Sequence, residues 1–133
     1  MAITYEDIEK EALKIIEENP TFKYGDFRAK QLGLKEFIPL NSSCSYIDED
    51  GNGSCLFGRI LTNLGLNSEE IAVYEGDGID SVLNVFNIET THEQSFFLSA
   101  LQSNQDKNYE YADVLENAKE ELESYLSEDE IYV

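Results

Sequence analysis

Oxygen side chains that can bind a cation gather between Asp48 and Asn52. Asp48, Asp50 and Asn52 stand at the first, third and fifth positions of a twelve-residue calcium loop, and Gly53 stands at the sixth. The twelfth position of such a loop requires a bidentate glutamate, and this sequence has Arg59 there. Because a guanidinium repels a cation, we expect a solvated turn in preference to a metal site.

Cys55 carries the most reactive side chain in this part of the sequence. We expect it in the first turn of a helix, where free backbone N–H groups stabilise a thiolate. A cysteine nucleophile also needs a base, and the only histidine is His92, within a predicted capping box. A cysteine-dependent hydrolase using Cys55 and His92 is therefore an alternative. A buried, chemically inert cysteine is the favoured interpretation.

The stretch GNGSCLFGRI distantly resembles the DGNCLFRAI-type motif of ovarian-tumour-type deubiquitinases. Two residues, Gly53 and Ser54, are inserted here between Asn52 and Cys55, which alters the spacing that an oxyanion site would need. Cys44 lies across the predicted turn, so a disulfide with Cys55 is sterically feasible. The charged N-terminus, MAITYEDIEK, is not a secretory signal, so we expect both thiols to be reduced.

The composition predicts a folded, highly acidic protein. Of the 133 residues, 41% are hydrophobic, and 28 acidic side chains face 9 basic ones, for a formal net charge of -19. This charge opposes direct binding to nucleic acid, and no apolar run is long enough to span a membrane. We expect a cytoplasmic protein of a host cell, one domain over residues 1–133 with an acidic tail at 127–133, and no cofactor.

Periodicity and capping residues predict a mainly α member of the α+β class, with five or six helices around a short β-hairpin. The hairpin would turn at Asp50-Gly51 and Asn52-Gly53. Residues 21–40 are expected to form an irregular connection with at most one short strand or helical turn. The expected helices run from Thr4 to Asn19, from Ser54 to Gly65, from Asn67 to about Tyr74, from Ile79 to Phe86, from Thr90 or Thr91 to about Leu101, and from Tyr111 to Tyr125.

Gly58 stands in the middle of the helix expected from Ser54 to Gly65. A glycine there costs about 1 kcal/mol of helix stability relative to alanine. We therefore expect another backbone to pass close to Gly58.

The last predicted helix has two different faces. Tyr111, Leu115, Ala118, Leu122 and Tyr125 are spaced as in a helix–helix seam, which we expect to dock on the domain's own core; a homodimer through 111–126 is the alternative. Acidic residues line the other face, among them Glu116, Glu120 and Glu123. We expect this face to bind a basic host or phage protein, including a nucleic-acid-binding protein whose groove it would fill. The alternative is a solvated surface that only keeps the protein soluble.

Four patches of the sequence resemble a family of small proteins of unknown activity found in actinobacteria and their phages. The family usually has Pro where this sequence has Gly53, and Trp where it has Tyr111. The resemblance implies a mostly helical domain in a phage or mobile-element setting, and it implies no activity. The patches are Asn19-Pro20 with Phe22 and Tyr24; Cys44 with Tyr46; Gly51, Ser54, Cys55, Leu56, Gly58, Leu61, Leu64 and Gly65; and Phe97, Leu98, Leu101, Gln102, Gln105, Asp106, Tyr111, Ala112 and Ala118.

Gln102, Gln105 and Asp106 form a polar patch for which the sequence offers no structural reason, so they are a further candidate binding site. A solvated helix end is the alternative. A small-ligand site near Tyr46, Cys55 and Gln102 is a third functional hypothesis.

Overall fold

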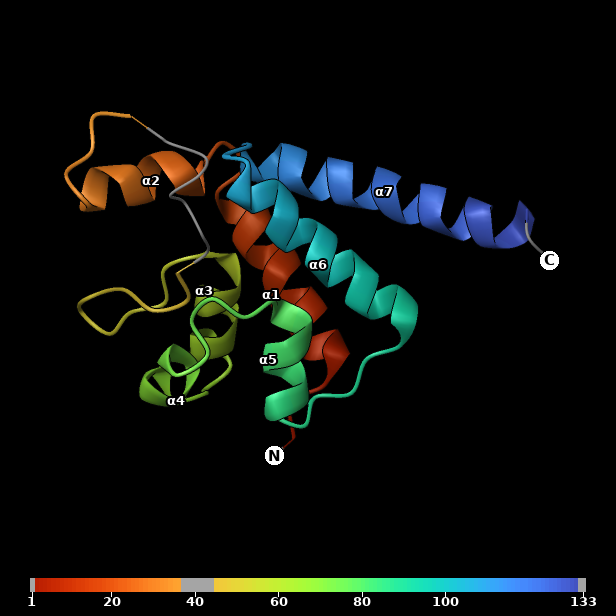
Figure 1. The fold of residues 1–133 in the computed structure, drawn as a ribbon, viewed down its shortest axis with the longest axis horizontal. Coiled ribbons are helices and arrows are strands. Elements are labelled where there is room, and N and C mark those ends of the chain that lie inside the picture. Colours follow the sequence, from red (N-terminus) through yellow and green to blue (C-terminus); the bar gives the residue numbers. More distant parts are fainter. Residues whose placement is uncertain (1, 37–44, 132–133) are drawn as a thin grey trace.

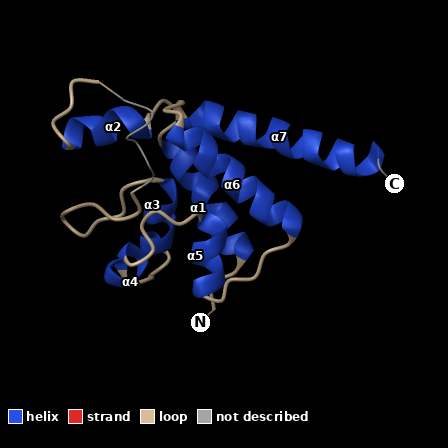
Figure 2. Cartoon of the chain, in the orientation of Figure 1, coloured by secondary structure: helices blue, strands red, loops and turns tan. Residues whose placement is uncertain are grey.

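The computed structural model describes residues 2–36 and 45–131, and this part of the chain is mainly helical (Figures 1 and 2). The described residues form seven helices, whereas the sequence predicted five or six. The additional helix, Tyr24–Gln31, lies in the stretch that was expected to be an irregular connection. The predicted hairpin is not confirmed: one antiparallel bridge joins Ile47 and Gly53. The helices are α1 (Tyr5–Glu18), α2 (Tyr24–Gln31), α3 (Leu56–Asn63), α4 (Ser68–Ala72), α5 (Ile79–Val85), α6 (His92–Asp106) and α7 (Tyr111–Ile131).

Helices α1 and α6 begin at the capping boxes that the sequence predicts. The Thr4 hydroxyl accepts from the Asp7 backbone N–H while the Asp7 carboxylate accepts from Thr4, and Thr91 and Gln94 repeat the arrangement at α6. Helix α1 ends at Glu18 with Asn19 as its C-cap, directly before Pro20, as expected. Its buried stripe consists of Tyr5, Ile8, Ala12, Ile15 and Ile16.

Helices α6 and α7 lie side by side, and the last turns of α7 extend beyond the rest of the molecule in Figure 1. Tyr111 and Ala118 of the predicted seam are fully buried, and Leu115 and Leu122 pack partly buried against the core. The seam of α7 therefore docks on the protein's own α6 and α1. Among the described residues, no helix is both long enough and apolar enough to cross a bilayer.

The loop before α3 lies directly on that helix. A side chain at Gly58 would overlap the backbone carbonyl of Tyr46, and a Cβ at Gly53 would lie 2.6 Å from the carbonyl oxygen of Gly58. The expected close approach of another backbone at Gly58 is therefore confirmed. Gly65 has φ of 97° and follows the end of α3, as its position in the sequence predicts.

Candidate functional site

Two glutamines on α6 join three helices. The Gln105 side-chain carbonyl accepts from the backbone N–H of Leu56, at the start of α3. One turn earlier, the Gln102 carbonyl accepts from the backbone N–H of Ile79, at the start of α5. Neither α3 nor α5 has a capping side chain at its own N-cap, so α6 satisfies a free N–H group of each. The two glutamines are buried and structural, so they are not an exposed binding patch.

Buried polar groups continue from this pair. The Tyr46 hydroxyl donates to the Asp77 carbonyl and accepts from Gln102 Nε2, 2.9 Å away. Gln105 Nε2 donates to the Asp106 carboxylate at 3.1 Å, and burial raises the pKa of Asp106 to about 6. The polar groups of Tyr46 and Gln102 are therefore committed to the fold, and these two side chains leave no free polar end for a small ligand.

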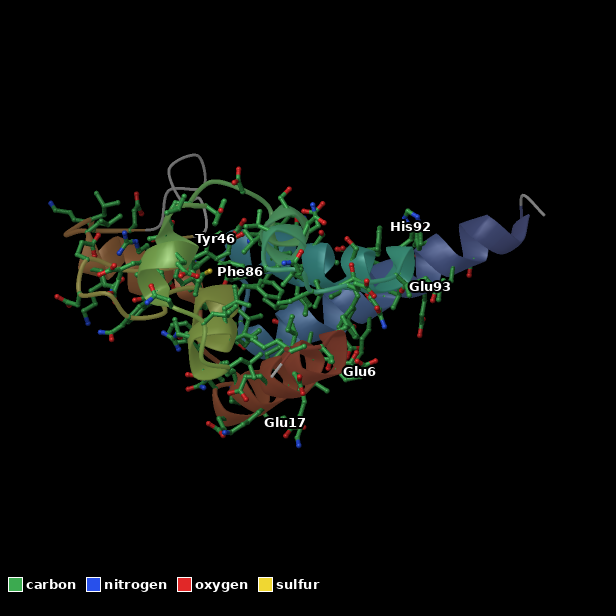
Figure 3. All side chains as sticks on the ribbon, turned by 90° about the horizontal axis from the view of Figure 1, so that it is seen from below. Glu6, Glu17, Tyr46, Phe86, His92 and Glu93 are labelled. Carbon is green, nitrogen blue, oxygen red and sulfur yellow. The ribbon has the colours of Figure 1, made fainter. Side chains whose placement is uncertain are left out.

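The structure does not bring Cys55 and His92 together. His92 is the exposed first residue of α6, whereas Leu56, next to Cys55, contacts Gln105 at the opposite end of the same helix. Thirteen residues of helix separate those ends by roughly 20 Å. Figure 3 accordingly shows His92 well away from Tyr46, whose carbonyl accepts from the backbone N–H of Ser54.

Cys55 is fully buried and disulfide-bonded, so the expectation of a reduced thiol is wrong for this residue. The chain's other cysteine, Cys44, lies outside the described residues. Cys55, and not Ser54, is the N-cap of α3. The Ser54 hydroxyl instead contacts the Tyr24 hydroxyl at 3.4 Å.

The turn with calcium-like spacing is held by its own hydrogen bonds. One oxygen of Asp48 accepts from the backbone N–H groups of Asp50 and Asn52, at 2.9 and 3.0 Å. Within residues 2–36 and 45–131, no cluster of three or more His, Cys, Asp or Glu side chains is placed to hold a metal. The Arg59 guanidinium lies over the Phe22 ring, 4.7 Å from its centroid, and donates to the Ser54 carbonyl.

The exposed face of α7 carries a row of carboxylates, which we call the α7 acidic row: Asp113, Glu116, Glu120 and Glu123. Their spacing of three, four and three residues keeps them on one side of the helix, with one carboxylate per about 5 Å of helix axis. All four side chains are exposed. The ion pair found among the described residues joins Arg28 to Glu49, so it neutralises none of the four. Lys119, the only base in α7, is three residues from Glu116 and four from Glu123, and it also lines a groove with Tyr5 and Leu122.

A second surface, the aromatic groove, runs between α6 and α7. Phe96 and Tyr125 stack there with ring centroids 4.4 Å apart and planes 13° from parallel. Phe96 was not predicted as a site residue. The sequence feature that could have identified it is the pair Phe96-Phe97. Neighbouring residues on a helix point about 100° apart, so both rings cannot enter the core. The groove is open to solvent, has a volume of about 480 Å³, and is lined by Phe96, Asn117, Glu120, Glu121, Ser124 and Tyr125.

Comparison of the chain with protein-family models, with curated proteins and with solved structures gave no match. The resemblance to small actinobacterial and phage proteins therefore stays a prediction.

Proposed function

We propose that this protein works without catalysis, by binding a basic macromolecular partner through the α7 acidic row. The observation that carries the proposal is the position of Glu116, Glu120 and Glu123, exposed on one face of a helix that extends past the rest of the molecule (Figure 1). Lysine and arginine side chains of a partner could reach all of them at once.

The acidic row has a cost for the isolated protein. Glu116 and Glu120 are four residues apart, and like charges at this spacing destabilise a helix by about 0.2 to 0.5 kcal/mol. Glu120 and Glu123 repeat the repulsion three residues on, and Lys119, three residues from Glu116 and four from Glu123, offsets part of it. A basic partner replaces this repulsion by attraction. The acidic row thus contributes to binding, whereas it does not help the isolated protein to fold.

The row also supports mimicry of a nucleic acid as the mode of binding. One strand of B-DNA carries a phosphate per about 3.4 Å of helix axis, and the α7 row carries a carboxylate per about 5 Å. A groove that tracks a phosphate backbone with lysine and arginine would meet a similar line of charge. The partner that fits this chemistry is a nucleic-acid-binding protein of a host or a phage, which the acidic row would inhibit.

The test is affinity capture from a host lysate at rising salt with three forms of the protein. One form is wild type, the second carries Glu116→Lys, Glu120→Lys and Glu123→Lys, and the third carries a matched reversal on α1. The α1 form changes the net charge equally, through Glu6→Lys, Glu17→Lys and Glu18→Lys. These α1 side chains are exposed, and Figure 3 shows Glu6 and Glu17 pointing away from the body of the molecule.

Capture by the wild-type and α1 forms, with loss in the α7 form and release by added duplex DNA, is the expected result. Equal capture by all three forms would contradict the proposal.

A further inference from the structure

The aromatic groove combines a stacked pair of aromatic rings with carboxylates. Phe96 and Tyr125 are half-buried and stacked, so each ring covers one face of the other and the pair leaves one outer face on each ring. Exposed Glu120 and Glu121 stand on the α7 side of this stacked pair. No lysine, arginine or histidine is among the described residues that line the groove.

One of the two carboxylates of the groove is held in position by a hydrogen bond. Glu121 Oε1 accepts from the buried amide of Asn104 at 3.1 Å, which orients that carboxylate beside the rings. Glu120 belongs to the α7 acidic row and links the groove to it. The groove therefore offers a positioned carboxylate, a second acid at its rim and an aromatic surface.

The neighbouring groove between α1, α6 and α7 is less suited to a cation. Its lining includes Lys119, and its Glu9 carboxylate already accepts from the Tyr5 hydroxyl at 2.7 Å. Charge complementarity thus distinguishes the two surfaces: the aromatic groove is acidic without an opposing base, and the other is not.

We infer that the aromatic groove binds an arginine side chain of the basic partner, with the guanidinium on the outer face of the Tyr125 ring and its N–H groups directed to Glu121 and Glu120. Arginine fits better than lysine because its charge is planar and weakly hydrated, so it stacks on an aromatic face while its fork of donors meets a carboxylate. This inference rests on the proposed function and specifies the anchor of the partner.

The probes are two blocked peptides of equal length, hexa-arginine and hexa-lysine, titrated into the full chain by calorimetry. Wild type is expected to bind the arginine peptide about three- to fivefold more tightly, the gain typical of a cation–π contact at an exposed site. In NMR spectra of the wild type, only the arginine peptide should shift the ring resonances of Phe96 and Tyr125, which tests the site without any substitution.

Tyr125→Leu removes the aromatic face and should abolish the preference for arginine, and Tyr125→Phe should retain it. Tyr109→Leu is the matched control, because Tyr109 is 41% exposed and does not line the groove. The α7 charge-reversal form should weaken both peptides.

Equal affinity of wild type for the two peptides, or an arginine preference that survives in folded Tyr125→Leu, would overturn the arginine site while leaving the proposed function standing. Failure of wild type to bind either peptide would count against both.

Discussion

The side-chain carbonyl of Gln105 accepts a hydrogen bond from the backbone N–H of Leu56, 49 residues earlier in the chain. This bond fixes the start of α3 against the end of α6, and α3 lacks a capping side chain of its own. Gln102 repeats the arrangement for α5 through Ile79. The packing of three helices therefore depends on buried polar groups that are hydrogen-bonded between helices.

Gln105→Ala should lower the free energy of unfolding by about 2 to 3 kcal/mol, because it leaves the buried Leu56 N–H without an acceptor and opens a space. Ser103→Ala, an exposed change on the same helix, should stay within about 0.5 kcal/mol of wild type. Urea unfolding measures both. Equal effects of the two changes would show that Gln105 has no special structural role.

Gly58→Ala should destabilise the protein by about 3 kcal/mol, since the added methyl group would overlap the Tyr46 carbonyl. In an open helix the same change stabilises by about 1 kcal/mol, so the sign of the effect is the test. Ser81→Ala on the exposed face of α5 serves as the control for helix propensity alone. A stabilised Gly58→Ala protein would mean that the loop carrying Tyr46 does not lie on α3.

Asp106 should make stability depend on pH in a definite direction. Burial raises the pKa of this carboxyl from 3.8 to about 6, so the folded protein binds the proton more tightly than the unfolded chain. The stability from protonated Asp106 is therefore complete below pH 3.8 and is lost as the pH rises through about 6.

Asp106→Asn removes this dependence and still offers an oxygen to Gln105 Nε2. The variant should be more stable than wild type at neutral pH by roughly 2 kcal/mol, and the difference should shrink on acidification to about pH 4. Urea unfolding of both proteins at the two pH values measures it, and the comparison cancels the general relief of acidic repulsion. A difference that stays constant would contradict this account of Asp106.

The turn at Asp48 should be indifferent to calcium. Asp48→Ala is expected to cost about 1 kcal/mol, because the N–H groups of Asp50 and Asn52 lose their acceptor but remain open to water. Thermal unfolding of wild type in millimolar calcium and in chelator should give the same midpoint. A midpoint that rises with calcium, and no longer does so in Asp48→Ala, would identify a metal site there.

Local signals predicted much of this fold. Thr4 and Thr91 cap their helices as their sequence neighbours indicate, and Pro20 and Gly65 mark helix ends. The apolar spacing of α7 likewise identified the face that docks on the core, because burial of one helix face leaves a regular imprint on the sequence.

Features that depend on distant partners were not predictable in the same way. Helix α2 has three buried positions in eight residues, and its buried Tyr24 is held by Ser45, 21 residues on. Gln102 and Gln105 looked like surface residues because the helix ends that they cap, at Leu56 and Ile79, are distant in the sequence. The aromatic groove likewise required the packing of α6 against α7 to bring Phe96 to Tyr125.

The most direct test of the central claim is the dissociation constant of the captured partner, once purified, for the wild-type, α7-reversal and α1-reversal forms. We expect the α7 form to bind at least about tenfold more weakly and the α1 form to stay within about threefold of wild type, because charges outside a contact act only through the general field. Equal losses in the two reversal forms would mean that net charge alone governs binding, and the α7 acidic row would not be the working surface.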